Sequence, residues 1–169
     1  MPFEIATITL ENGARIGVCP APGRDGAFDA DMVKILQWKP DAVVSMTDRQ
    51  EMRRAGAAEL PDRLADAGVA WRSLPIRDLG GPTGEDEKSW PRLADELHAI
   101  LDRKGAVLAH CYAGRGRSGM VALRLMTERG HKPEAALQQI RAARPGAVEA
   151  DAQFRWAAAG ARGGASGAW

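Results

Sequence analysis

Hydrophobic positions along the chain follow two alternating periods, one typical of strands and one typical of helices. Short apolar runs such as Asp41–Met46 and Ala106–Ala109 indicate buried strands, whereas Glu85–Arg103 carries apolar residues at helical spacing. Strand and helix signals alternate through most of the chain, which is the pattern of an α/β sheet covered by helices. We therefore predict a central, mainly parallel sheet with helices on both faces.

Turn and helix-breaking residues give the boundaries of the predicted elements. Asn12-Gly13 predicts the tight turn of a hairpin over residues 5–18, which we expect at an edge of the sheet. Pro61 is expected to break residues 49–66 into helical segments, and Thr47 with Gln50 predicts a capping box before them. We also expect a strand at Trp71–Ile76 and helices at Phe28–Trp38, Arg117–Arg129, Lys132–Arg144 and Ala150–Ala159.

The length and composition of the chain favour one domain. A chain of 169 residues, 45% of them hydrophobic, can bury one core. We assign this domain to residues 1–159. Residues 160–169, rich in Gly and Ala, have little to bury and are expected to form a flexible tail.

Charge and cysteine usage exclude several classes of function. With 23 basic and 22 acidic residues the net charge is +1, so we expect no nucleic-acid partner and no stable membrane association. The amino end lacks a secretory pattern and no apolar stretch is long enough to span a membrane, which predicts a cytoplasmic protein. Two cysteines and three scattered histidines lack the spacing of a zinc site. We expect neither a metal nor an organic cofactor.

The segment that carries chemistry is VLAHCYAGRGRSG, residues 107–119, which runs from an apolar strand through a glycine-bearing turn into a helix. Such a turn points backbone N–H groups inward, and with the positive end of the helix they form a site for a tetrahedral anion such as phosphate. Arg117 can offer two parallel N–H bonds to phosphate oxygens. The same donors favour the thiolate of Cys111, the nucleophilic form of cysteine.

A plainer interpretation is that Cys111 is a small buried residue and that Gly114 and Gly116 only turn the chain. The fixed offsets of His, Cys, Arg and Ser between a strand and a helix argue against it. The letters HCYAGRGRS resemble the His-Cys-(five residues)-Arg-Ser signature of the protein tyrosine and dual-specificity phosphatases. We call residues 110–118 the signature loop.

The resemblance extends over most of residues 16–157. Segments VCPAPG at 18–23, PIRD at 75–78 and RPG at 144–146 are similar to the small phosphatases associated with cyclin-dependent kinases. The resemblance implies that Cys111 is the nucleophile, that Arg117 holds the phosphate, that Ser118 donates its hydroxyl to the departing thiolate, and that His110 orders the loop. The remaining loop positions would line the bound phosphate: Tyr112, Ala113, Gly114, Arg115 and Gly116.

A phosphatase of this kind needs an acid at the leaving oxygen. Asp78 follows a predicted strand, has Gly80-Gly81 beside it as hinges, and occupies the place of the family's acid. Glu85 and Asp86 compete for the role, although they also suit a helix start. Gln153 stands where several family members carry a glutamine that orients water; the alternative is an amide on a helix surface.

The substrate is expected to be a phosphorylated protein or peptide, with phosphoinositide as the alternative. Arg115 is basic at a position where many relatives are aliphatic, which resembles lipid phosphatases, but Tyr112 stands where those enzymes often carry lysine. The single Tyr in the chain means that the phosphotyrosine-recognition loop of the large enzymes is absent, which favours a shallower cleft and dual specificity.

Two other functions use a similar loop, namely phosphate binding without catalysis and rhodanese-type sulfur transfer. The presence of Cys111, Arg117, Ser118 and Asp78 together favours a phosphatase. Cys19 is expected to be a buried packing residue, with disulfide formation to an oxidised Cys111 as the alternative. The histidines outside the loop, His98 and His131, are expected to have surface roles.

Overall fold

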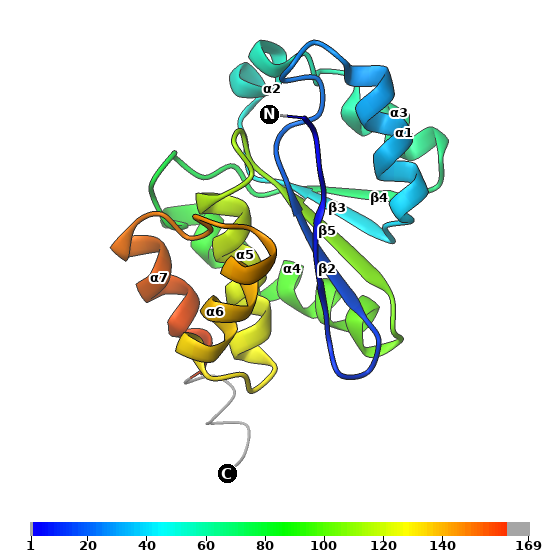
Figure 1. Cartoon of the computed structure of the whole chain (residues 1–169). Helices are drawn as coiled ribbons and strands as arrows, with labels where there is room; N and C mark the ends of the chain where they lie inside the picture. Colours follow the sequence, from blue (N-terminus) through cyan, green and yellow to red (C-terminus); the bar gives the residue numbers. More distant parts are fainter. Residues whose placement is uncertain (1, 162–169) are drawn as a thin grey trace.

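A five-stranded sheet lies between two layers of helices in the computed structural model, which describes residues 2–161 (Figure 1). The strand order is β1-β2-β5-β3-β4; β1 and β2 are antiparallel, and all other neighbours are parallel. The strands are β1 Ala6–Thr9, β2 Arg15–Cys19, β3 Ala42–Ser45, β4 Ala70–Ser73 and β5 Ala106–His110. This arrangement confirms the predicted mainly parallel α/β fold, with the first strand of the hairpin at an edge.

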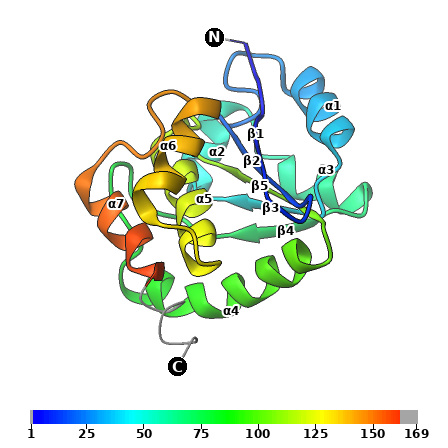
Figure 2. The ribbon, with the colours of Figure 1, turned by 60° about the horizontal axis from the view of Figure 1, so that its bottom comes forward.

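Seven helices cover the sheet in the described part of the chain. One face is covered by α1 Phe28–Trp38, α2 Arg49–Ala55 and α3 Leu60–Asp66. The other face is covered by α4 Gly84–Asp102, α5 Gly116–Glu128, α6 Pro133–Ala143 and α7 Asp151–Ala158. Figure 2 shows α4 lying along one side of the sheet and α5 packed between the sheet and the α6–α7 pair. Within residues 2–161, no helix combines the length and apolar character that crossing a membrane requires.

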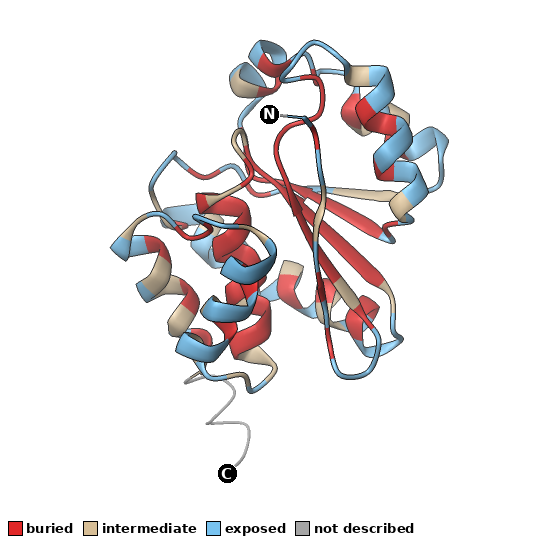
Figure 3. Ribbon diagram, viewed as in Figure 1, coloured by how far each residue is buried: buried red, intermediate tan, exposed pale blue. Residues whose placement is uncertain are grey.

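The central strand β5 links the two halves of the core. All five of its residues are buried, and Figure 3 shows the buried colour running through the middle strands. Val107 and Ala109 pack toward α4–α7, whereas Leu108 packs toward α1–α3. A strand buried on both faces has its register fixed, because a slip of one residue would exchange the two faces. The carboxyl end of β5 is therefore held firmly, and the signature loop begins there.

Two predicted boundaries, a helix break and a strand end, differ from the structure. The break in residues 49–66 lies at residues 56–59, where Gly56 adopts a φ of 79°, and Pro61 instead stands in the first turn of α3. Proline is tolerated there because its missing N–H would have no helical partner. The predicted strand at 71–76 ends at Ser73, since Pro75 has no N–H to continue the ladder.

The capping box of α2 uses Asp48 and Glu51, and the prediction of Thr47 with Gln50 was one residue off. Asp48 accepts the backbone N–H of Glu51 at 2.8 Å. The Thr47 hydroxyl is buried and has no hydrogen-bond partner among the described residues.

The boundary predicted at residue 160 lies at the end of the described chain. Gly160 is buried, and a Cβ placed on it would meet the Thr127 hydroxyl of α5. Residues 162–169, the greater part of the predicted tail, lie outside the described residues.

Candidate active site

The signature loop wraps around the sulfur of Cys111 at the carboxyl end of β5. Cys111 is 2% exposed, and its Sγ accepts the N–H of Gly114 at 3.2 Å and lies 3.3 Å from the hydroxyl of Ser118. The turn requires glycine at position 114: φ is 74°, and a Cβ would meet the backbone of Cys19 and Pro20. The structure thus brings together the sulfur and the hydroxyl that the sequence predicted to act as a pair.

The carbonyl groups of the loop are held away from its centre. Arg144, the residue that ends α6, donates from Nε to the Gly114 carbonyl and from Nη2 to the Ala113 carbonyl, each at 2.9 Å. The Tyr112 carbonyl accepts the N–H of Ala21 at 3.1 Å. Because the N–H and C=O of a peptide unit point in opposite directions, these bonds turn the loop N–H groups inward. The arrangement supports the prediction of an anion-binding loop.

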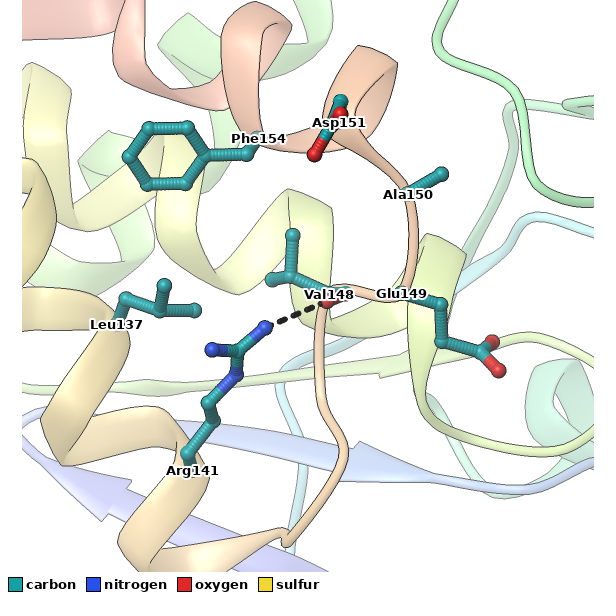
Figure 4. A pocket seen from close by; sticks show the side chains of 7 residues that line it. All are labelled: Leu137, Arg141, Val148, Glu149, Ala150, Asp151 and Phe154. Atoms are coloured by element: carbon teal, nitrogen blue, oxygen red, sulfur yellow. Dashed lines mark hydrogen bonds between the residues drawn. The ribbon is translucent and has the colours of Figure 1, made fainter.

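The loop before α7 closes the site from the side of α5. The N–H of Val148 donates to the Arg115 carbonyl at 3.2 Å, and Arg141 in turn donates to the Val148 carbonyl at 2.8 Å. Figure 4 shows this second bond at the wall of a cavity of about 250 Å³, with the Glu149 side chain directed away from Arg141 and Phe154. The α6–α7 connection therefore fixes one end of the signature loop.

His110 is buried in a line of hydrogen bonds that runs from the sheet to Cys111. The Trp71 indole donates to the Ser45 hydroxyl at 2.8 Å, and that hydroxyl lies 2.5 Å from Nε2 of His110. Nδ1 of His110 lies 3.1 Å from the Cys111 carbonyl. Burial lowers the pKa of His110 to about 4, so the ring is neutral at pH 7. A neutral ring with Nδ1 as donor to the carbonyl leaves Nε2 to accept the Ser45 hydroxyl.

Arg117 is the largest side chain that is fully enclosed, at 2% exposed. Its Nη1 and Nη2 each donate to a different carboxylate oxygen of Glu51 in α2 at 2.8 Å, and Nη1 also donates to the Ile76 carbonyl at 3.0 Å. Burial opposes the charged form of Arg117, but the hydrogen bonds to Glu51 and the charges of Cys111, Glu51 and Asp78 outweigh it and raise the arginine's pKa. The Nε is buried and has no hydrogen-bond partner among the described residues, and the Oδ1 of Asp78 lies 3.7 Å from it.

Of the three carboxylates predicted to compete as the acid, Asp78 lies at the mouth of the site. Its Oδ1 is 3.7 Å from Nε of Arg117 and accepts the N–H of Leu79 at 3.0 Å, and its side chain is 72% exposed. Glu85 and Asp86 stand in the first turn of α4. Burial, with a smaller contribution from Glu85, raises the pKa of Asp86. Neither of the two forms an ion pair with Arg117.

Gln153 lies inside the protein, so the alternative of an amide on the helix surface was wrong. It is fully buried, and its Oε1 accepts the N–H groups of Glu149 at 2.9 Å and Ala150 at 3.1 Å. Its Nε2 has no partner among residues 2–161 and lies 3.0 Å from where a Cβ on Gly116 would stand. An unpaired buried donor beside the loop is suited to hold water.

Sequence reasoning missed the residues that support the loop from other elements. Glu51 could be recognised only as the third residue of a helix, and Arg144 only as part of a resemblance. Trp71 and Ser45 carried no signal beyond strand packing. The contacts that give these residues a role join positions far apart in the sequence, such as 51 with 117 and 114 with 144.

Cys19 and His98, two predicted residues outside the signature loop, both lie in packed parts of the structure. Cys19 is buried as expected, and burial first and Cys111 second raise its pKa well above the usual value. The two cysteines are free thiols. His98 is partly buried, and its Nε2 forms a hydrogen bond of 2.9 Å with Oε1 of Glu128, so it links α4 to α5. No group of three or more His, Cys, Asp or Glu side chains within residues 2–161 is placed to hold a metal ion.

Comparison with known proteins gives consistent results. A family model described as a DSP-PTPase phosphatase of polymorphic toxin systems matches residues 21–130. Cyclin-dependent kinase inhibitor 3 of Homo sapiens is 30% identical over 168 residues, covering 92% of this chain and 77% of the relative. A crystal structure of a kinase associated phosphatase with serine in place of its catalytic cysteine has a TM-score of 0.82 at 24% identity, with 98% of both chains covered. PTPMT1 in complex with PI(5)P shares the fold, with a TM-score of 0.77 at 16% identity over 97% of this chain and 99% of that one.

A cysteine enclosed by such a loop at the carboxyl edge of a parallel sheet fits a cysteine-dependent phosphatase, the class to which the matched family model belongs. The matched model and relatives show that the chain belongs to the dual-specificity group of the protein tyrosine phosphatase family. It is a dual-specificity protein phosphatase similar to the kinase associated phosphatases, which confirms the predicted family and enzyme class. The phosphoinositide phosphatase and the non-catalytic module are not favoured.

The neutral state of His110 predicts a loss of stability in acid. Between pH 6.5 and about 4 the unfolded chain binds a proton at this residue and the folded chain does not, so the free energy of unfolding falls as the pH falls. The contribution is about 3 kcal/mol. Urea unfolding at several pH values should show a shallower pH dependence in His110→Asn than in the native chain. His131→Asn is the control, and equal slopes in all three proteins would contradict the prediction.

Replacing Glu51 with glutamine should impair the site without removing any group that touches the sulfur. The buried Arg117 would lose its charge partner, and we expect kcat/KM to fall by about 10- to 100-fold with weaker vanadate binding. Glu96→Gln is the matched control, because it breaks an exposed bidentate pair with Arg72. Equal activity in the two variants would show that Glu51 does not position Arg117.

Proposed function

We propose that the chain hydrolyses phosphate monoesters on proteins through a phosphocysteine intermediate, with Cys111 as the nucleophile. The observation that carries the proposal is the placement of the Cys111 sulfur, 3.2 Å from the Gly114 nitrogen and 3.3 Å from the Ser118 hydroxyl. The charge of Cys111 also helps to raise the pKa of Arg117, so the guanidinium lies within electrostatic range of the sulfur. A phosphoryl group on the sulfur would occupy the centre of these donors.

In the first step the thiolate of Cys111 attacks phosphorus, and the bond from phosphorus to the leaving oxygen breaks. Asp78, at the mouth of the site, gives its proton to that oxygen. Arg117 stabilises the charge on the phosphoryl oxygens, with Nε as the group that makes no hydrogen bond within the described residues, while Glu51 fixes the guanidinium.

In the second step a water molecule attacks the phosphocysteine and the sulfur–phosphorus bond breaks. The unpaired Nε2 of Gln153 can hold this water beside Gly116, and Asp78 accepts its proton. The Ser118 hydroxyl donates to the thiolate that leaves. The products are inorganic phosphate and the free thiolate of Cys111.

The direct test is hydrolysis of para-nitrophenyl phosphate by the native chain under reducing conditions with a chelator present. We expect turnover in the native chain and its loss in Cys111→Ser, since the serine hydroxyl is not ionised at neutral pH. A folded native chain that binds vanadate but gives no turnover would contradict the proposed reaction.

The pH profile identifies the acid. The first step needs a proton donor at the leaving oxygen, and a general acid makes the rate decline on the basic side of the pH profile. Asp78→Asn should lower kcat/KM by about 10²-fold or more for substrates with poor leaving groups and flatten the basic limb. Asp86→Asn is the control from the competing carboxylates. A flattened limb in Asp86→Asn alone would assign the acid to α4.

A further inference from the structure

Two arginines converge on the side chain that directly follows the nucleophile. The Cζ of Arg54 lies 4.9 Å from the centre of the Tyr112 ring, and the Cζ of Arg24 lies 5.5 Å from it. Arg54 comes from the last turn of α2 and Arg24 from the segment after β2, so they reach the ring from separate parts of the sequence. We call Arg24, Arg54 and Tyr112 the arginine platform.

The backbone beneath the platform is packed tightly. Gly23, with a φ of 84°, lies so close to the end of α2 that a Cβ on it would be 2.8 Å from the Ala55 carbonyl oxygen. The N–H of Gly23 donates to the buried carboxylate of Asp31 at 2.8 Å. These contacts fix the residue before Arg24 against the residue after Arg54. The proximity of the two guanidinium groups is therefore built into the fold.

The positive charge of the platform is not balanced within the described residues. Neither Arg24 nor Arg54 forms an ion pair with a carboxylate there, whereas Arg63, Arg72 and Arg117 each do. Stacking over an aromatic ring leaves the guanidinium N–H groups free to donate. Interaction with the helix dipole explains an arginine at the end of α2, but it does not explain why a second arginine meets it over Tyr112.

We propose that Arg24 and Arg54 form a second anion subsite, which binds a carboxylate or phosphate on a residue near the phosphorylated residue of a protein substrate. This inference rests on the proposed function and adds a preference for acidic phosphopeptide segments. Successive residues of an extended peptide advance about 3.3 Å. When the phosphorylated residue is bound at Cys111, a residue a few positions along the peptide can therefore reach the platform on the adjacent Tyr112.

The surface favours a peptide over a lipid headgroup. A lipid substrate presented in a bilayer would be expected to meet an apolar surface near the site. Within residues 2–161 the exposed large hydrophobic side chains are Val33 and Leu36 on α1 and Leu79 beside Asp78, too few to form such a surface. An acidic peptide in solution needs only the charges that the platform supplies.

The test compares kcat/KM on matched phosphopeptides whose flanking residues are acidic or neutral. We expect the native chain to prefer the acidic peptide by about tenfold, and the preference to fall to about one in an Arg24→Gln, Arg54→Gln double variant. The control is Arg15→Gln, which removes an arginine stacked over Trp38 at 4.3 Å, at the end of β2 opposite Cys19. This variant should keep the tenfold preference.

The outcomes separate this inference from the proposed function. If the native chain hydrolyses para-nitrophenyl phosphate but treats both peptides alike, or if the double variant keeps the preference, the subsite assignment is wrong while the phosphatase reaction stands. A parallel assay uses a water-soluble phosphoinositide with a second phosphate. If the double variant loses activity on that compound and not on the acidic peptide, the platform serves lipid headgroups and the peptide assignment is overturned.

Discussion

The buried ion pair between Arg117 and Glu51 connects the segments on which the site depends. Arg117 lies in the first turn of α5, and Glu51 lies in α2 on the other side of the sheet. The same guanidinium donates to the carbonyl of Ile76, two residues before Asp78. Removing two charges from water is costly unless their hydrogen bonds are well satisfied. The bidentate geometry meets that condition. One interaction therefore positions the helix start and the segment that leads to Asp78.

The distribution of charge around the signature loop depends on the ion pair between Arg117 and Glu51. Glu51 balances the guanidinium through Nη1 and Nη2, while the Nε of Arg117 has no hydrogen-bond partner among the described residues. A neutral His110 adds no charge beneath Cys111, and its ring is a link in a hydrogen-bonded line from Trp71. Positive charge is thus concentrated where phosphate would bind, and the supporting groups below it are neutral.

The sequence predicted local features well and long-range support poorly. The apolar runs predicted a mainly parallel sheet. The nine residues from His110 to Ser118 identified the loop because they form one continuous segment. Helix ends were displaced where two residues competed for one role, as with Asp48 and Thr47. Glu51 and the buried environment of Gln153 depend on packing between distant elements, which periodicity does not report.

The hydrogen bonds from Arg144 to two loop carbonyls determine whether the signature loop could work in another protein. The nine-residue signature depends on other segments for its conformation. Its outward carbonyls accept hydrogen bonds from Arg144 after α6 and from Ala21 after β2. Grafted onto another strand–helix junction, the same letters would lack these donors, and the peptide units would be free to turn their carbonyls toward the anion. A designer who transplants this chemistry must carry over the surrounding hydrogen-bond donors as well as the motif.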